Sequence, residues 1–312
     1  RLSLARWLVD PQHPLTARVA VNRFWQQFFG VGLVKTPNDF GSQGEPPSHA
    51  ELLDWLATGF MQDGWDGKRF VKAIVMPATY RQESKVTSAI LSADPENRLL
   101  SHAPRFRLDG EAVRDGALFV SGLMNPAIGG KGVRPYQPEN IWEPVAYSGS
   151  NTRVYKQDSG DALYRRSLYT FWRRTIAPVN MFDVSSRQAC RVRTTQTTSP
   201  LHALTMLNDP TWVEAARVLA ERVSKEQTTD DARLSRAFAL ILSRPPNERE
   251  QALLRNLLAR QRAVYADDPK AADALLAVGA RPRDPSLKNT EQAALTAACL
   301  ALLNLDAAQT RD

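Results

Sequence analysis

The chain has 312 residues, of which 43% are hydrophobic and 23% are charged. These proportions are typical of a soluble globular protein, and they exclude a disordered chain as the default. The length predicts about two lobes, and no apolar run approaches the roughly 20 residues that a membrane-spanning helix needs.

The positive charge is uneven along the chain. The net charge of +7 comes from 31 Arg and 9 Lys against 33 acidic residues, and seven of the arginines lie between Gly160 and Pro200. This segment is the expected anion-facing surface. Nucleic acid is not the expected partner, because no helix carries a basic stripe and no aromatic RNA-binding signature is present.

The first periodic segment begins at Pro14 and ends before Gly30. Apolar residues follow one another at helical spacing from Leu15 to Phe29, which predicts an amphipathic helix. Residues 31–47 then form a Gly- and Pro-rich connection. We expect this loop to be ordered, because Leu33 and Val34 can pack while Asp39 bonds backbone amides.

The next two helices have start signals of different kinds. Ser48 and Glu51 are spaced as a capping box, which predicts a helix that ends near Gly64. Asp66 is the expected cap of a third helix that runs to about Met76.

A fourth predicted helix, from about Leu108 to Met124, carries a strip of charge. Arg107, Glu111, Arg114 and Asp115 lie at i, i+4, i+7 and i+8, and therefore on one face. The strip is either a structural ladder of ion pairs or a site in which arginines tune the pKa values of two carboxylates.

The pattern changes between Gly129 and Pro200. The run "TRVYKQ", the turn "DSGD" and the run "ALYRRSLYTFWRRT" predict a small β-hairpin. Its arginine pairs, at 165/166 and 173/174, flank an aromatic strand, and each pair is expected to send one guanidinium to either face.

The C-terminal part returns to helical periodicity. Asp209 before Pro210, and Asn247 with Glu250, are expected helix starts. The last helix, about Glu291 to Leu305, is apolar nearly all round and is expected to be buried. We therefore predict a mainly α protein with a helical part over residues 1–128, an irregular part with the hairpin over 129–198, and a helical part over 199–312 that packs as one unit with the first.

The sequence predicts no haem attachment and no metal site. Cys190 and Cys299 lack CxxCH or CxxC spacing, and the four histidines show no ligand spacing. We expect no cofactor in this segment.

Several blocks in order carry a resemblance to a known family. They are "HPLTARVAVNRFWQQFFGVGLVKTPNDFGSQGEPPSHAELLDWLA", "KRFVKAIVMPATYRQES", "RLDGEAVRDGALFVSG", "YRRSLYTFWRRT", "TTQTTSPLHALTMLNDP" and "ALLNLD". The chain resembles the C-terminal domain of unknown function of large planctomycete-type proteins that carry a cytochrome-c-like domain upstream. His13 stands where that family commonly has a capping Asn.

The resemblance implies a location and partners, but no established activity. It implies a secreted or extracytoplasmic protein, haem c in an upstream domain only, and the upstream domains of the same polypeptide as partners. The start at Arg1, without Met or a signal-like segment, fits a piece of a longer protein.

Three functions remain open, and the favoured one is a structural or partner-docking domain. The alternative is an enzyme or binding module that acts on anionic polysaccharide through a cleft of carboxylates and arginines. Its candidate catalytic residues are Asp39, Glu45, His49, Glu111 and Asp115. Its candidate ligand-binding residues are Arg107, Arg114, Arg166 and Arg174. Carboxylates facing each other across a polar cleft would favour the enzyme, whereas Asp39 or Glu45 capping nearby amides would favour a scaffold.

Overall fold

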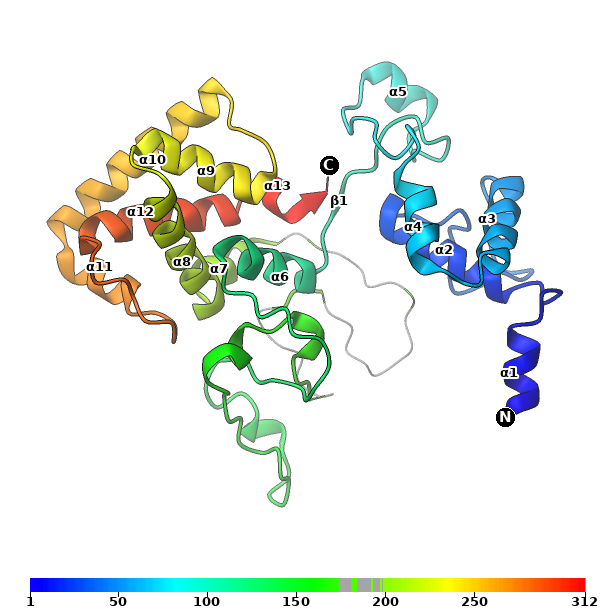
Figure 1. The fold of residues 1–312 in the computed structure, drawn as a ribbon, viewed down its shortest axis with the longest axis horizontal. Helices are drawn as coiled ribbons and strands as arrows, with labels where there is room; N and C mark the ends of the chain where they lie inside the picture. The colour runs from blue at the N-terminus through cyan, green and yellow to red at the C-terminus, as the bar shows by residue number, and fades with distance from the viewer. Residues whose placement is uncertain (174–180, 184–191, 193–196, 198, 312) are drawn as a thin grey trace. The chain divides into compact units, whose positions relative to one another are not determined.

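The computed structural model describes residues 1–173, 181–183, 192, 197 and 199–311. Within these residues it contains thirteen α-helices, three short 3₁₀ helices and one pair of two-residue strands (Figure 1). The predicted mainly helical class is confirmed.

The chain divides into two compact units. The first is formed mainly by residues 1–106, and the second mainly by residues 107–310. The predicted boundary at residue 128 lies elsewhere, because α6 (Gly110–Ser121) belongs to the second unit. Val113, Ala117 and Leu118 of this helix are buried in the same core as the C-terminal helices.

Residues 1–106 of the first unit form five helices. They are α1 (Leu2–Leu8), α2 (Thr16–Phe29), α3 (Ala50–Gln62), α4 (Gly67–Val75) and α5 (Ser88–Ala93). Its core lies between α2, α3 and α4, where Phe24, Phe60 and Phe70 contact one another with ring centroids 5.0 to 5.9 Å apart. Each of the three lies on the apolar face of its own helix, so their packing together follows from the amphipathic pattern.

The connection between α2 and α3 is held against the core. Leu33 and Val34 are buried. The buried Asn22 amide of α2 donates to the Val34 carbonyl at 3.0 Å and accepts from the Val34 amide at 2.9 Å. Arg98 donates to the carbonyls of Gly32 and Leu33, both at 3.0 Å. These contacts hold the loop against α2, in agreement with the order predicted for residues 31–47.

The second unit contains the remaining α-helices. Besides α6 they are α7 (Pro200–Asn208), α8 (Pro210–Glu226), α9 (Asp230–Leu242), α10 (Glu248–Asp267), α11 (Pro269–Leu276), α12 (Asn289–Leu303) and α13 (Asp306–Gln309). Helix α12 packs against α8, α10 and α11. Ten of its residues are buried, so the predicted burial of the last long helix is confirmed.

Most predicted helix starts are confirmed, and one is wrong. Asp66 and Asp209 accept hydrogen bonds from backbone amides of α4 and α8, and Asn247 forms a capping box on α10. The predicted capping box at Ser48 does not form. The N-cap of α3 is His49, and the Ser48 hydroxyl instead lies 3.0 Å from the His49 ring.

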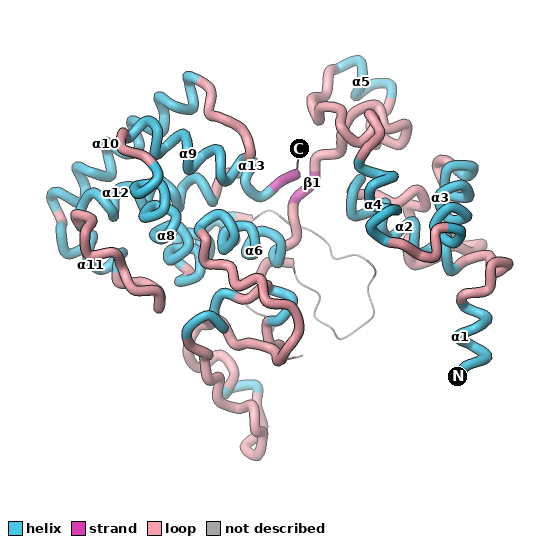
Figure 2. Tube along the Cα trace, in the orientation of Figure 1, coloured by secondary structure: helices cyan, strands magenta, loops and turns pink. Residues whose placement is uncertain are grey.

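The predicted hairpin is absent from the described residues of the middle segment. Its second strand is replaced by two 3₁₀ helices, η2 (Gly160–Tyr164) and η3 (Ser167–Tyr169), and loops dominate the segment (Figure 2). A further 3₁₀ helix, η1 (Glu143–Val145), precedes them. Isolated bridges join Asn125 to Arg165 and Val133 to Thr170. The alternation of side chains was misleading, because side chains of α6 bind the backbone of this run and replace a strand partner.

The small pair of strands lies elsewhere in the chain. Strand β1 (Phe106–Arg107) pairs with β2 (Thr310–Arg311). Next to the pair, the Leu108 amide donates to the Gln309 carbonyl at 2.8 Å, and the Arg107 guanidinium donates to the Gln309 side chain.

Candidate functional site

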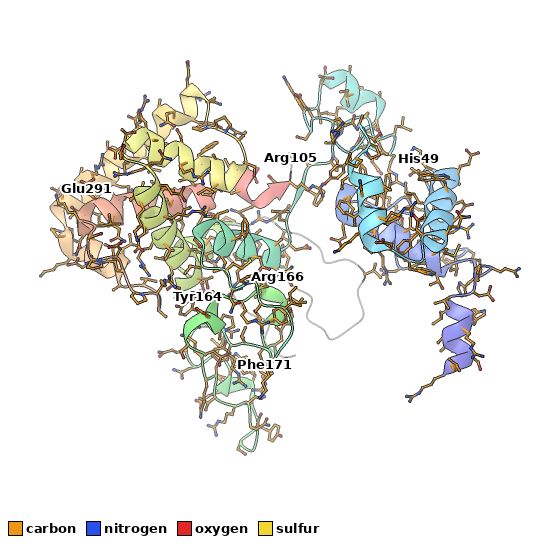
Figure 3. The ribbon with its side chains drawn as sticks, in the orientation of Figure 1. His49, Arg105, Tyr164, Arg166, Phe171 and Glu291 are labelled. Atoms are coloured by element: carbon orange, nitrogen blue, oxygen red, sulfur yellow. The ribbon has the colours of Figure 1, made fainter. Side chains whose placement is uncertain are left out.

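The predicted site residues divide between the two units. Asp39, Glu45 and His49 lie in the first unit, whereas Arg107, Glu111, Arg114, Asp115 and Arg166 lie in the second. Arg174 lies outside the described residues. Figure 3 labels His49 at the start of α3 and Arg166 beside η3.

The loop candidates make short-range contacts. Asp39 Oδ1 accepts a hydrogen bond from the Gly41 amide at 2.7 Å. The Glu45 amide donates to Thr36 Oγ1 at 2.9 Å, and the Glu45 residue is exposed. Asp39 thus stabilises a local turn, which is the arrangement expected of a scaffold.

Arg114 is a buried structural residue. Its side chain is 1% exposed. Its Nη1 donates to the Arg165 carbonyl at 3.0 Å and to Ser167 Oγ at 3.2 Å, and its Nη2 donates to the Leu163 carbonyl at 3.0 Å. Burial lowers the pKa of Arg114 and the Asp115 carboxylate opposes that shift, but a guanidinium stays charged. Arg114 therefore holds η2 and η3 against α6.

Asp115 of α6 also binds the segment that Arg114 holds. Its Oδ1 accepts from the amide and the hydroxyl of Ser167, both at 2.7 Å. Its Oδ2 lies 3.5 Å from Arg166 Nε, and the Arg166 side chain is half exposed. Arg107 binds Gln309 near the C-terminus. The structure thus brings Arg114, Asp115 and Arg166 together and directs Arg107 to a different segment.

Arg165 is also used within the fold. Its guanidinium donates to the carbonyls of Ala127 at 2.9 Å, Gly129 at 2.5 Å and Lys131 at 3.0 Å. It lies 3.7 Å from the centroid of the Tyr169 ring. Because its donors bind loop carbonyls, Arg165 shapes the 127–131 loop. The Tyr169 ring therefore stacks on a guanidinium of its own chain.

A second buried polar group surrounds Glu214 of α8, which is 1% exposed. Its carboxyl oxygens accept from the hydroxyls of Tyr136 and Tyr164, both at 3.0 Å, and from the Arg281 amide at 2.6 Å. Burial, with the nearby Glu214 carboxyl, raises the pKa of Tyr136 to about 12. The pKa of Tyr164 is raised for the same reasons.

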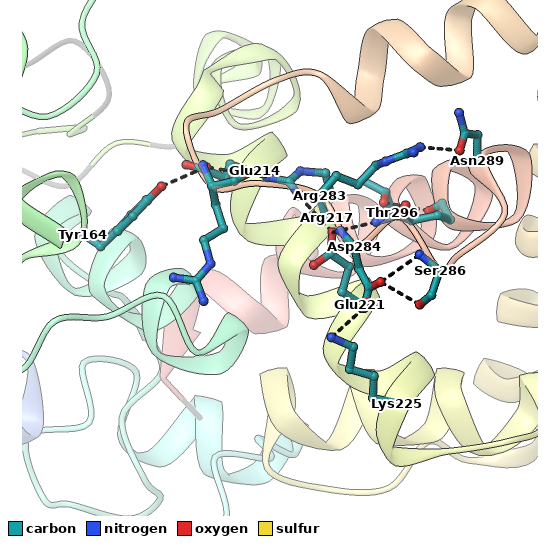
Figure 4. A network of polar contacts seen from close by, with 12 residues as sticks. Tyr164, Glu214, Arg217, Glu221, Lys225, Arg283, Asp284, Ser286, Asn289 and Thr296 are labelled. Carbon is teal, nitrogen blue, oxygen red and sulfur yellow. Dashed lines mark hydrogen bonds and ion pairs between the residues drawn. The ribbon is translucent and has the colours of Figure 1, made fainter. Parts of the chain in front are cut away.

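The network continues along α8 (Figure 4). Arg217 Nη1 bonds Glu221 Oε1 at 2.9 Å, and Gln292 of α12 donates to the same oxygen at 2.7 Å. Lys225 lies 2.7 Å from Asp284, and its charge together with bonds from Ser286 lowers the pKa of that carboxyl. The network joins α8 and α12 to the loop between α11 and α12.

The backbone of the loop between α11 and α12 approaches the Glu214 carboxyl group closely at Gly279. Gly279 has φ +96°, and a Cβ there would lie 2.3 Å from the Glu214 carboxyl carbon. The loop can therefore reach Glu214 only with glycine at this position. Sequence reasoning did not select these residues. Their signal was the placing of Glu214, Arg217 and Glu221 at i, i+3 and i+7 on one face of an Ala-, Val- and Leu-rich helix.

Within the described part of the chain, no group of three or more His, Cys, Asp or Glu side chains is arranged to hold a metal ion. In the same residues, no helix combines the length and apolar character needed to cross a membrane. Cys299 is buried as a free thiol.

Comparison with known proteins identifies a family without a known activity. The model of the family described as "PSD1: Protein of unknown function (DUF1553)" matches residues 1–258. Searches of curated proteins and of solved structures found no match. The matched range ends inside α10, whereas the second unit continues through α12.

Proposed function

The chain belongs to the PSD1 (DUF1553) family of proteins of unknown function, and we propose that it is a structural and docking domain of a larger secreted protein. In this proposal its partners are the upstream domains of the same polypeptide, one of which is cytochrome-c-like and carries the haem. The protein is extracytoplasmic.

The use of the predicted site residues supports a structural role. The Arg114 side chain and the Asp115 carboxylate bind the 163–167 run, and Asp39 binds its own loop. Polar groups that are already paired in the folded state lose those bonds if they turn toward a ligand. These contacts favour the scaffold over the carboxylate and arginine cleft of the alternative.

Helix α1 carries the docking part of the proposal. It contributes no buried residue to the first unit. Leu2, Leu4 and Trp7 of this helix, and Val9 directly after it, are each more than half exposed, between 57% and 63%. A seven-residue helix has little stability of its own, and exposed apolar groups gathered on one element mark an interaction surface. Covering this helix would both bury apolar area and stabilise the helix.

The upstream domain is the occupant that the chain connectivity favours. In the longer protein, any domain joined to residue 1 is held within a few residues of α1. Such tethering gives an effective concentration in the millimolar range, so a modest apolar contact suffices for docking.

Hydrogen exchange in the longer polypeptide tests this proposal. We expect the amides of Leu2–Leu8 to exchange slowly when the upstream domains are present and rapidly in the present chain alone. The double change Leu4→Asp and Trp7→Ser should restore rapid exchange in the longer protein. The matched control Trp55→Ser, which alters an exposed tryptophan of α3 (68% exposed), should leave exchange in α1 unchanged. Equal exchange of α1 in the two lengths of chain would reject docking through this helix.

A further inference from the structure

The first unit has an open hollow that none of the predicted site residues lines. Ala78, Thr79, Arg81, Gln82 and Leu100 form its walls, and its volume is about 710 Å³. The hollow is shallow and open to solvent, so a ligand there would be covered on one side only. No carboxylate is among these lining residues.

Arg81 is the charged group of the hollow. It is exposed, and among the described residues its guanidinium forms no ion pair and no side-chain hydrogen bond. This differs from Arg98, Arg114 and Arg165, whose guanidinium groups bind backbone carbonyls. A guanidinium with its planar set of donors unused is suited to a carboxylate or sulfate.

Two neutral residues add complementary hydrogen-bonding groups. The side-chain nitrogen of Gln82 donates to the Thr79 carbonyl at 2.9 Å and to the Leu100 carbonyl at 2.8 Å. Both amide protons are therefore used, and the side-chain oxygen of Gln82 is left as an acceptor. The Thr79 hydroxyl can donate or accept. Together with Arg81, these groups match an anion that also carries hydroxyl groups.

The apolar part of the hollow is built by an unusual backbone. Leu100 has φ +57°. A positive φ is uncommon for residues other than glycine, and especially for bulky ones. The Gln82 bond to its carbonyl stabilises this conformation. Residues held in such conformations occur disproportionately at ligand sites. Leu100 and Ala78 supply apolar surface on which the carbon face of a ligand can rest.

We propose that this hollow binds the carboxylate or sulfate group of a small hydroxylated ligand, such as an acidic sugar, through Arg81, Thr79 and Gln82. The ligand's anionic group pairs with the Arg81 guanidinium, and its hydroxyl groups bond Thr79 Oγ1 and Gln82 Oε1. None of the lining residues belongs to α1, so variants of the hollow and variants of α1 test the two proposals separately.

Ligand-observed NMR titration of the whole chain tests the site. The probes are glucuronate, glucose 6-sulfate and, as the neutral reference, glucose. We expect saturable binding of an acidic probe with a dissociation constant on the order of 1 mM, as for one charge-assisted pair with a few hydrogen bonds. Arg81→Gln should weaken binding by about tenfold or more. Arg23→Gln removes an equal charge from an exposed position on α2 and should leave binding unchanged.

The same titration shows which of the two anions binds. It is repeated with a second variant, Thr79→Val. Binding of glucuronate alone or of glucose 6-sulfate alone identifies the group that the hollow takes. Thr79→Val removes one hydroxyl at nearly constant shape and should also weaken binding, and it decides the matter if Arg81→Gln does not fold. The proposal is overturned if neither acidic probe binds, if glucose binds equally well, or if both variants bind as tightly as the parent chain.

Discussion

At the scale of single residues, the same residue type serves different purposes in this chain. Arg114 and Arg165 bind carbonyls inside the second unit, whereas Arg81 lines an open hollow without a partner among the described residues. Residue type and helical spacing identified Arg114 as a candidate site residue. They could not distinguish a buried structural arginine from one that binds a ligand. The acceptors of Arg114 lie 49 to 53 positions away, so the distinction depends on long-range contacts.

Replacing Arg114 tests whether its side chain stabilises the packing of the 163–167 run against α6. In Arg114→Met the carbonyls of Leu163 and Arg165 lose their donor while they remain next to α6. Leaving buried acceptors unsatisfied should lower the free energy of unfolding by about 2 to 4 kcal/mol. Urea denaturation measures the change.

The neighbouring Arg166 provides the control for Arg114. It is half exposed and contacts Asp115 at 3.5 Å, so Arg166→Met should cost less than about 1 kcal/mol. Equal destabilisation by the two changes would contradict the structural role of Arg114.

The tyrosines that bond Glu214 should make the folded state less stable at alkaline pH. Burial raises the pKa of Tyr136 to about 12, above the value of about 10 in an unfolded chain. The neutral hydroxyl therefore stabilises the folded state fully below pH 10, and this contribution is lost as the pH rises from about 10 to about 12. Thermal unfolding between pH 8 and pH 12 should show the decline.

Two variants separate Tyr136 from the other tyrosines. Tyr136→Phe should lower the melting temperature at pH 8 and reduce the decline above pH 10. Tyr147→Phe, at a position 74% exposed, should change neither. An unchanged pH profile in Tyr136→Phe would show that this hydroxyl does not provide the linkage.

At the scale of elements, local signals and long-range contacts have separable effects. The amphipathic period and Gly30 correctly gave the extent of α2, and Asp66, Asp209 and Asn247 correctly marked helix starts. These signals act within one turn of helix, so they are readable from sequence. The 160–173 run has an alternating pattern but no neighbouring strand among the described residues. Its polar backbone groups instead bind Arg114 and Asp115.

Helix α3 shows why a cap motif alone is insufficient. Ser48 and Glu51 had the spacing of a capping box, yet the Ser48 amide donates to the Leu33 carbonyl at 2.9 Å. This bond ties residue 48 to the loop before it, and the helix begins after His49. The loop contact, 15 positions away, decides the start.

At the scale of the whole molecule, each compact unit has its own hydrophobic core. The core of the first unit draws on residues 17–74, and that of the second on residues 113–303. The second core includes Leu295, Cys299 and Leu302 of α12, all beyond the range matched by the family. The folded unit is therefore larger than the matched sequence.

Truncation tests the importance of α12. A chain that ends at Leu258 should lose the cooperative unfolding transition of the second unit, because the apolar faces of α8 and α10 are left exposed. The first unit should stay folded, since its core lies entirely upstream. Circular dichroism with differential scanning calorimetry measures both transitions. A chain that ends after Asp306 keeps α12 and serves as the control, and equal stability of the two truncated chains would contradict this account.

Local sequence signals are enough to predict the helical class, most helix positions and the burial of α12, because periodicity and caps depend on neighbours within about one turn. These signals also predict the charged face of α6. Tertiary structure decided what that face does, where the small strand pair lies, and that Glu214 is enclosed by two tyrosines. Tertiary structure also decided that Arg81 lines a surface hollow. Each of these depends on segments that are distant in the sequence meeting in space, and a buried polar group binds whichever partner the packing brings within hydrogen-bond distance.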